Sequence, residues 1–414
     1  MSSPRIFATL LILALGTSPA HGQEKKATGA PQTDASVASS SGGDWHFVVS
    51  GDSRNCGDLV MPAIAADAAK YHPAFYWHLG DLRAIYEIDE DYAGEFNANG
   101  TLNVWDMETY TKAAWDDFIR MQIEPFERLQ IPFAIGIGNH ETIAPMSREK
   151  FIEKFSPWLD SSVLRDQRLK DAATSVAGRE AEAIHAYYHW IGGGVDFIYL
   201  DNASDEQFDA SQMAWLKERL DQDRANPGIH SIVVGMHKAL PDSLSNAHSM
   251  SESAAGLQSG RSVYRKLEAI QREDHKQVYV LSSHSHFIMT DIYNTQFWRD
   301  HKVDIVQGIL VGTAGAVRYR LPSPLPKTNG SAASSTQDPR AFCAQTDVYG
   351  YLLATVHAQG SIDFQFKEID EKDVPAEVQA KFAPDTMRVC FQGNKQMAPT
   401  ADTTQDLPDG PDPF

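Results

Sequence analysis

Five short clusters of potential metal ligands occur in a fixed order along the chain, and each follows a stretch rich in apolar or β-branched residues. The clusters are Gly51-Asp52-Ser53-Arg54, Gly80-Asp81, Gly138-Asn139-His140-Glu141, the lone His237, and Ser283-His284-Ser285-His286. At such positions the strands of an α/β sheet deliver side chains to the C-terminal edge of the sheet. Two carboxylates, one amide and three imidazoles converging there would form a two-metal site for hydrolysing phosphate esters.

The residue types also predict how the ligands divide between two ions. Two cations about 3.5–4 Å apart can neutralise the phosphate oxygens and generate hydroxide near neutral pH. Asp81 is the natural bridging carboxylate, because an anion between two dications offsets their mutual repulsion. The remaining ligands would be Asp52 and His286 for the first ion, and Asn139, His237 and His284 for the second. This donor set suits iron, manganese and zinc alike, so the predicted cofactor is a pair of divalent or trivalent ions of unassigned identity.

His140 directly follows a predicted ligand, so we expect it at the rim of the site rather than among the ligands. With an ordinary pKa of about 6.5, a histidine can carry the proton that a leaving alkoxide needs. Glu141 is expected to hold that imidazole in orientation. The predicted reaction is attack of a metal-activated hydroxide on a phosphate ester, with His140 as the general acid.

These clusters resemble the motifs of the calcineurin-like metallophosphoesterases, which include the purple acid phosphatases. The family pattern is D-x-H, G-D, G-N-H-D/E, a single His and G-H-x-H, and the likeness spans about Trp45 to His286. The resemblance implies a four-layer αββα sandwich of two mixed β-sheets flanked by helices, a dinuclear site and phosphoester hydrolysis. By position it implies the same assignment of Asp52, Asp81, Asn139, His237, His284 and His286 to the two ions, and of His140 as the acid.

Two positions depart from this pattern. Arg54 stands where the common form has a histidine, and an arginine does not ligate metals because it stays protonated. Purple acid phosphatases also lack this histidine and use a tyrosine three residues after the second motif's aspartate, where this chain has Ala84. Tyr86, Asn55 and solvent are candidates for the missing ligand, and Arg54 could instead clamp a substrate phosphate. The second departure, Ser283 for a glycine, is expected to affect backbone shape only.

The N-terminal residues indicate export. Arg5 is the only charge before the apolar stretch 6–15, which small residues follow up to Gly22, as in a secretory signal. The apolar stretch is too short to span a bilayer, so we expect a periplasmic or secreted protein without a stable membrane anchor. The predicted organisation is a signal peptide 1–22, a disordered linker 23–43, a catalytic domain 44–392 and a disordered tail 393–414.

The net charge limits the kinds of binding partner that we expect. The 414 residues carry a formal net charge of −19, which disfavours nucleic acid and leaves a small phosphorylated substrate as the expected partner. The sequence leaves the oligomeric state open.

Three cysteines in an exported chain leave one unpaired. We expect a disulfide between Cys343 and Cys390, with Cys56 as a free thiol.

Periodicity predicts an α/β or α+β fold. The expected strands cover 45–50, 75–79, 132–137, 186–191, 195–200, 232–235, 277–281, 305–311, 351–357 and 362–366. The expected helices cover 59–71, 110–129, 209–221 and 261–272. An acidic, aromatic insertion over 85–108 is expected as a rim or cap, and long loops over 238–259 and 320–340. His248, in the first of these loops, is interpreted as a solvated histidine that could reach substrate.

Two alternative functions use the same residues. Because Arg54 leaves the first ion short of a ligand, the protein could be a degenerate family member that binds metal or a phosphorylated ligand without turnover. Alternatively, the enzyme could be a phosphodiesterase or nucleotide hydrolase, since the residues that select the substrate lie outside the five clusters.

Overall fold

The computed structural model describes residues 43–103, 105–173, 183–203, 207–245, 248–321 and 344–399. The predicted signal peptide lies outside these described residues, as do all but one residue of the predicted linker. The same holds for positions 322–340 of the predicted exposed loop and for Cys343.

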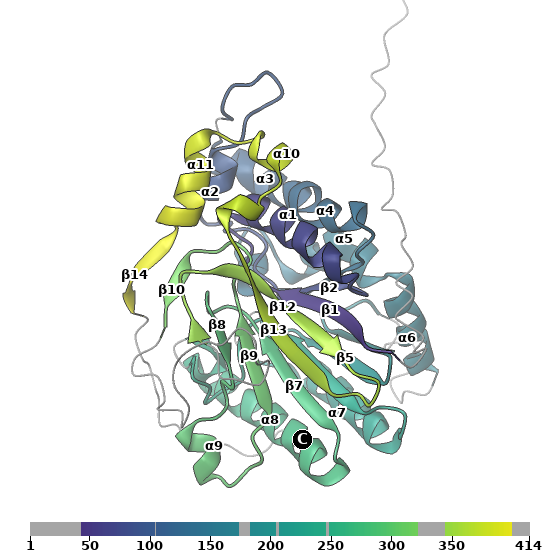
Figure 1. Ribbon diagram of the computed structural model, residues 1–414. Helices are drawn as coiled ribbons and strands as arrows, with labels where there is room; N and C mark the ends of the chain where they lie inside the picture. The colour runs from purple at the N-terminus through teal and green to yellow at the C-terminus, as the bar shows by residue number, and fades with distance from the viewer. Residues whose placement is uncertain are drawn as a thin grey trace, which may run out of the picture. The chain divides into compact units, whose positions relative to one another are not determined.

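Two mixed β-sheets lie face to face (Figure 1). The first sheet has the strand order β13-β12-β1-β2-β3, and the second has the order β11-β8-β9-β7-β6-β5-β4. The strands of the first sheet are β1 (Trp45–Ser50), β2 (Tyr76–His78), β3 (Phe133–Ile135), β12 (Tyr349–Val356) and β13 (Ile362–Ile369). Those of the second are β4 (Tyr188–Gly192), β5 (Val195–Leu200), β6 (Ser231–Met236), β7 (Gln277–Ser282), β8 (Ile288–Thr290), β9 (Gln307–Val311) and β11 (Ala344–Gln345). A separate pair joins β10 (Arg318–Arg320) to β14 (Lys395–Pro399).

Helices cover the outer face of each sheet, which confirms the predicted four-layer sandwich (Figure 1). On the first sheet lie α1 (Gly57–Ala68), α3 (Met107–Phe118), α4 (Glu124–Arg128) and α5 (Arg148–Leu159), and on the second lie α7 (Ala210–Ala225), α8 (Ala254–Asp274) and α9 (Gln296–Asp300). The other helices are α2 (Glu90–Ala93), α6 (Ser162–Ala172), α10 (Ala376–Gln379) and α11 (Pro384–Arg388). None of the described helices is long and apolar enough to cross a membrane.

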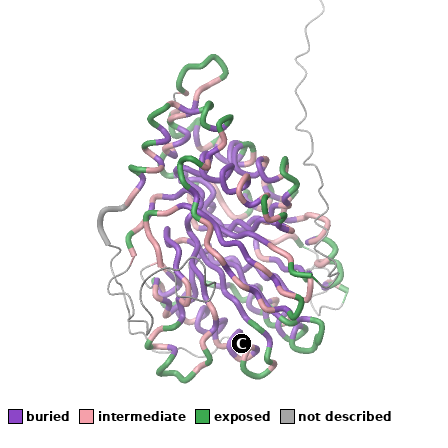
Figure 2. Tube along the Cα trace, viewed as in Figure 1, coloured by how far each residue is buried: buried purple, intermediate pink, exposed green. Residues whose placement is uncertain are grey.

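The two sheets are held together by aromatic side chains on their inner faces. The ring of Phe47 on β1 packs edge-on against Phe197 on β5 with centroids 5.2 Å apart, and Trp77 on β2 packs against Tyr199 on β5 at 6.1 Å. Figure 2 shows burial concentrated along the strands. Because burying each such ring contributes about 1.5–3 kcal/mol, this interface fixes one sheet relative to the other.

Most predicted elements are confirmed, with ends that differ by a few residues. The predicted hairpin forms as β4 and β5, and Gly193 and Gly194 adopt the left-handed backbone that its two-residue turn requires. The predicted helix over 110–129 forms as α3 and α4, joined by a π-helix over Ile119–Ile123. The elements α5, α6, β8, β10, β11 and β14 lie in segments where the sequence patterns indicate no helix or strand.

Two predicted boundaries are wrong. Helix α8 begins at Ala254 rather than near position 261, because Ser253 caps its first turn by accepting a hydrogen bond from the Gly256 N–H. This helix start shortens the predicted loop before it. At the other end of the chain, Asn394 is buried and Lys395–Pro399 forms β14, so the predicted disordered tail starts too early.

The predicted disulfide is also wrong. Cys56 pairs with Cys390, with the two Cα atoms 5.7 Å apart, so Cys56 is not a free thiol. The bond ties the loop after β1 to the segment that follows α11. Asn394 reinforces this junction by donating hydrogen bonds to the Tyr349 hydroxyl and the Gly315 carbonyl. Spacing along the sequence could not reveal this pairing, because the two cysteines are 334 residues apart.

The insertion over 85–108 packs against the C-terminal part of the chain. The Phe96 N–H donates to the Lys381 carbonyl at 2.8 Å, and the Ala383 N–H donates to the Gly94 carbonyl at 2.9 Å. Helix α2, inside the insertion, is therefore held beside α10 and α11 at the end of the molecule that they share in Figure 1.

A buried charged cluster joins the hairpin to the helices α6 and α7. Both ring nitrogens of His189 on β4 face carboxylates, with Nδ1 2.8 Å from Asp196 and Nε2 2.6 Å from Asp171. Arg219 lies 2.7 Å from the other oxygen of Asp171. Burial alone would lower the pKa of His189, but the two carboxylates outweigh burial and raise this pKa to about 10. Burial and the nearby Asp196 raise the pKa of Asp223 to about 9.

We expect the free energy of unfolding to fall between about pH 7 and pH 10. A histidine with a pKa of about 10 in the folded protein and about 6.5 in the unfolded chain stabilises fully below pH 6.5, and this stabilisation is lost as the pH rises through 10. The raised pKa of Asp223 acts in the same direction. His189→Gln removes the positive charge that lies between Asp171 and Asp196, and it should cost about 3 kcal/mol at pH 6 and less at pH 10.

Urea unfolding curves at a series of pH values measure this stability. If the wild-type and His189→Gln proteins show parallel pH dependence, the buried cluster does not act as described.

Candidate metal centre

The strand ends bring the predicted ligands to one edge of the two sheets. In the first sheet Ser50 pairs with His78, and His78 pairs with Ile135, so β1, β2 and β3 end side by side. In the second sheet Met236 pairs with Ser282, so β6 and β7 end together. The residues that follow these ends within a few positions are Asp52, Asp81, Asn139, His237, His284 and His286.

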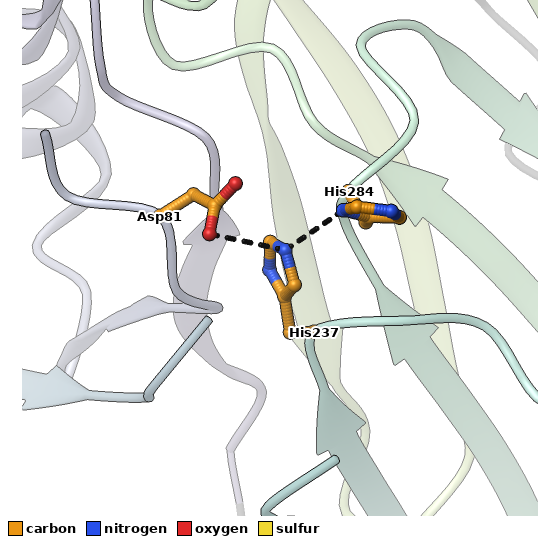
Figure 3. Close-up of side chains that lie close together, drawn as sticks. All are labelled: Asp81, His237 and His284. Atoms are coloured by element: carbon orange, nitrogen blue, oxygen red, sulfur yellow. Dashed lines mark hydrogen bonds and ion pairs between the residues drawn. The ribbon is translucent and has the colours of Figure 1, made fainter. Parts of the chain in front are cut away.

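Figure 3 shows the side chains of Asp81, His237 and His284 lying close together, and the amide oxygen of Asn139 also contacts His237. The Nε2 atom of His237 lies 3.2 Å from Asp81 Oδ1, 3.0 Å from His284 Nδ1 and 3.0 Å from Asn139 Oδ1. The ligand atoms of the aspartate and the two histidines all lie within 4.8 Å of one another. The set predicted for the second metal ion is therefore assembled in the structure.

The orientation of His237 is fixed from outside this cluster. Its Nδ1 lies 3.0 Å from the Leu79 carbonyl and 3.1 Å from Ser283 Oγ, so Nδ1 carries a proton and Nε2 faces Asp81. Burial alone would lower the pKa of His237, but the Asp81 carboxylate reverses this and raises the pKa to about 9. A cation bound here would displace that second proton. Ser283 thus contributes a side-chain contact, and the expectation that it affects only backbone shape is wrong.

Two buried carboxylate oxygens, Asp81 Oδ2 and Asp52 Oδ1, accept no hydrogen bond from the described part of the chain. Burial would raise the pKa of Asp81, but the neighbouring imidazoles and Arg54 hold it well below its usual range, so the carboxylate is charged. A buried charged oxygen without a hydrogen bond is costly unless a cation lies beside it. Carboxylate, amide and imidazole donors are those that divalent transition metals accept, so the residues around Asp81 fit a metal ion.

The backbone at this edge is held in unusual conformations. Asp52, Asp81 and His284 have φ angles of 59°, 60° and 64°, in the left-handed region that residues with a side chain rarely adopt. Gly138 lies so close to Asp81 that a Cβ atom would sit 2.3 Å from its Oδ1. The glycine in the third cluster is therefore required for close approach, and the turns aim three ligands inward.

The set predicted for the first ion is arranged differently. Asp52 Oδ1 lies 3.3 Å from His286 Nε2, and the guanidinium of Arg54 contacts His286 and Asp81. Arg54 Nη2 lies 3.3 Å from His286 Nε2, and Arg54 Nε lies 3.8 Å from Asp81 Oδ2. Tyr86 and Asn55, the candidates for the missing ligand, both accept hydrogen bonds from Arg54 Nη1, at 3.1 and 3.3 Å.

His140 lies beside the cluster, as expected. Its backbone N–H donates to Asp81 Oδ1 at 3.0 Å, and its side-chain Nε2 lies 3.5 Å from Asp81 Oδ2. The Nδ1–H donates to the Ala84 carbonyl at 2.7 Å, so Nε2 is the atom that faces the site. Burial lowers the pKa of His140, and the Asp81 carboxylate opposes that effect.

The role predicted for Glu141 is wrong. Its carboxylate does not orient His140, whose Nδ1 is bound to Ala84. Glu141 instead accepts hydrogen bonds from the backbone N–H groups of Gly138, Asp81 and Leu82, at 2.7, 2.9 and 2.9 Å. It therefore clamps the second cluster to the third. Burial and the nearby Asp81 raise the pKa of Glu141 to about 8.

Two aromatic residues that the motifs do not predict, Tyr319 and His248, form one wall of the site. Tyr319 on β10 stacks on His286 with ring centroids 3.9 Å apart, and His248 stacks on Tyr319 at 5.3 Å. His248 is not a solvated loop residue: burial, then the nearby His286, lower its pKa to about 4. No sequence motif includes Tyr319. Its place beside the site depends on the pairing of β10 with β14, which the sequence patterns do not indicate.

A fully buried arginine fixes the loops on the other side of the site. Arg83 Nη2 lies 2.7 Å from both Asp58 and Asp117, and Nη1 lies 3.3 Å from Asp89. A fourth carboxylate, that of Asp91, lies 3.7 Å away. Asp89 in turn accepts a hydrogen bond of 2.8 Å from the Asn55 N–H, next to Arg54. The network therefore joins the first cluster to the insertion after Asp81.

We expect Arg83→Met to destabilise the protein by about 3–5 kcal/mol, because it leaves several buried carboxylates without their cation. Thermal and urea unfolding at neutral pH measure the change. Arg128→Met is the matched control. This arginine is exposed, its one ion pair within the described residues is with Glu124, and its loss should change stability by less than about 1 kcal/mol. Equal stability of the two variants would show that the Arg83 network does not contribute to the free energy of unfolding.

Comparison with known proteins finds no matching protein-family model and no matching curated protein. Similar solved structures include the purple acid phosphatase PPD1 from yellow lupin (Lupinus luteus) seeds, at 16% identity over 78% of this chain and 51% of that chain, with a TM-score of 0.48. PhoD matches at 13% identity over 79% of this chain and 72% of that chain, with a TM-score of 0.42. GAP50, the anchor in the inner membrane complex of Plasmodium, matches at 12% identity over 86% and 98%, with a TM-score of 0.41.

This chain thus spans about half the length of the lupin phosphatase. At these identities and TM-scores, none of the likenesses assigns an activity to this chain. The chemistry of this protein has to follow from its own residues.

Proposed function

We propose that this protein is a metal-dependent phosphoesterase. The observation that carries the proposal is the convergence of Asp81, Asn139 and His284 on His237 Nε2, each with a donor atom 3.0–3.2 Å away. The buried, charged carboxylate of Asp81 supports it. Its Oδ2 accepts no hydrogen bond from the described residues, since Arg54 Nε lies 3.8 Å away, and a metal ion on this carboxylate would add to the compensation of its charge.

A divalent ion held by these four side chains would polarise a phosphoryl oxygen and lower the pKa of a water molecule toward neutrality. The protein supplies the remaining groups. Arg54 adds a permanent positive charge beside Asp81, which favours an anionic substrate. His140 presents Nε2 on the same side, with Nδ1 tied to the Ala84 carbonyl, so that it can protonate a leaving alkoxide.

The finer features of the proposal come from the sequence. The family resemblance implies two ions, with iron, manganese and zinc as the candidates. By the same resemblance, the first ion would be held by Asp52, Asp81 and His286, and Arg54 contacts the last two of these groups. The substrate is proposed to be a small phosphorylated molecule, since the net charge of −19 disfavours a nucleic acid.

We also propose that the protein is exported to the periplasm or the medium. The pattern over 1–22 supports export, as an apolar stretch between one basic residue and small residues is typical of a signal peptide. The disulfide between Cys56 and Cys390 also supports it, because such bonds persist in oxidising compartments.

A second candidate function is binding of a metal or a phosphorylated ligand without turnover. The contacts of Arg54 with Asp81 and His286 favour it, because they engage groups that a two-ion enzyme would need. Hydrolysis of a generic phosphate ester distinguishes a phosphoesterase from this non-catalytic candidate. Comparing a phosphate diester with a monoester distinguishes a phosphodiesterase from a phosphatase.

The metal-loaded full chain should hydrolyse 4-nitrophenyl phosphate, and Asp81→Asn should reduce kcat/KM at least about 100-fold.

His140→Ala should reduce kcat by about 10²–10⁴-fold with phenyl phosphate, whose leaving group is poor, and much less with 4-nitrophenyl phosphate. A missing proton donor matters most where the leaving oxygen is most basic. Steady-state kinetics with bis(4-nitrophenyl) phosphate as a third substrate measure the preference for diesters.

His357→Ala is the control, because this histidine lies between Asp44 and Asp363 at the surface and should leave all three rates unchanged. Metal binding without hydrolysis of any of the esters would favour the non-catalytic candidate. Equal losses for the two aryl monoesters in His140→Ala would exclude His140 as the proton donor.

A further inference from the structure

The guanidinium of Arg54 occupies the region where the first set of predicted ligands meets. Its Nη2 lies 3.3 Å from His286 Nε2 and its Nε lies 3.8 Å from Asp81 Oδ2, while Asp52 Oδ1 lies 3.3 Å from the same His286 nitrogen. Two of the three groups that would hold a first metal ion, Asp81 and His286, therefore already contact a cation that belongs to the chain, and Asp52 approaches the same His286 nitrogen.

His286 shows why this cation and a metal ion compete. Its Nδ1–H donates to the Val317 carbonyl at 2.6 Å, so the lone pair for a ligand is on Nε2. A metal ion would bind that lone pair at about 2.0–2.1 Å. Arg54 Nη2 donates to the same lone pair, and a guanidinium stays protonated at any physiological pH. One nitrogen lone pair cannot serve both.

Arg54 is also held in this position. It is only 5% exposed, and its Nη1 donates to the Tyr86 hydroxyl at 3.1 Å and to Asn55 Oδ1 at 3.3 Å. These two oxygens are the candidates for the ligand that the first motif lacks. They solvate the guanidinium instead, and Asn55 is fixed in turn by Glu90 and Asp89.

The second set of ligands differs in this respect. Around His237 Nε2 the three nearest donor atoms belong to Asp81, His284 and Asn139, which offer oxygen or nitrogen atoms and no permanent cation. The first set therefore does not fit a metal ion and the second does.

We propose that Arg54 takes the place of one metal ion, so that the centre binds a single ion through Asp81, Asn139, His237 and His284. The guanidinium then provides the counter-charge that Asp52 and Asp81 would receive from a first ion. This inference deepens the proposed function and rests on it, because it concerns the number of ions at the same site.

Metal stoichiometry tests the proposal. The full chain is stripped with a chelator, reloaded with excess Mn²⁺ or Zn²⁺, dialysed and analysed for metal per chain. We expect about one ion in the wild type and about two in Arg54→His, which removes the charge and supplies an imidazole. Arg128→His is the control for adventitious binding, because it adds an exposed histidine far from the site, and it should keep one ion.

Paramagnetic resonance of the Mn²⁺-loaded proteins gives a readout independent of activity. The wild type should show an isolated ion, and Arg54→His should show an exchange-coupled pair. If Arg54→His does not fold, as judged by near-ultraviolet circular dichroism, Arg54→Gln replaces it. That variant removes the positive charge beside the His286 lone pair without adding an imidazole, and titration calorimetry should detect a second, weaker ion.

Two ions in the wild type would overturn the inference and leave the proposed function intact. One ion in the wild type and in the folded Arg54 variant would also overturn it, because Arg54 would then not be what excludes the second ion. A wild type that binds no ion would contradict the proposed function itself.

Discussion

The arrangement of this site depends on one buried charge, that of Asp81. Asp81 lies three residues after the end of β2 and has a left-handed backbone conformation, which Glu141 stabilises by accepting hydrogen bonds from three neighbouring N–H groups. Its carboxylate is anionic although it is almost wholly buried, so the surrounding groups have to compensate the charge. A protonated His237, the His140 N–H and the Arg54 guanidinium all approach it. A metal ion would join this set by replacing a proton, which requires no rearrangement of the fold.

The two sheets contribute different chemistry to the site. The strands of the first sheet supply oxygen ligands on Asp52, Asp81 and Asn139, and those of the second supply the three imidazoles of His237, His284 and His286. The distances between oxygen and nitrogen ligands are therefore set by the packing of one sheet on the other. Tyr199 on β5 makes this connection close to the site, since its hydroxyl donates to the Ile137 carbonyl at 2.8 Å, two residues before Asn139. The aromatic interface between the sheets is thus also the support of the metal centre.

The sequence predicts those parts of the site that depend on strand ends. Ligands such as Asp52 and His284 follow apolar stretches, and parallel strands end at a common edge, so their convergence could be predicted from local pattern alone. The partner of Glu141 could not, because its position three residues after Gly138 allows either a side-chain or a backbone target. Tyr319 and the Cys56–Cys390 bond depend on where the last part of the chain returns, which no local pattern encodes. The buried network around Arg83 could not be predicted for the same reason, since Asp58, Asp89 and Asp117 lie in separate segments that only the folded chain brings together.

Arg54 illustrates how a motif can be kept while its physical meaning changes. A histidine at this position would add a neutral ligand to a site that is rich in negative charge, and a metal ion would have to supply the positive charge. An arginine supplies that charge directly and takes up the ligands around it, including the oxygens of Tyr86 and Asn55. The buried carboxylates are compensated in either case, so the fold around Asp52 and Asp81 needs no other change. A pattern search counts Arg54 as one missing ligand, whereas the contacts of its guanidinium favour the loss of one whole ion.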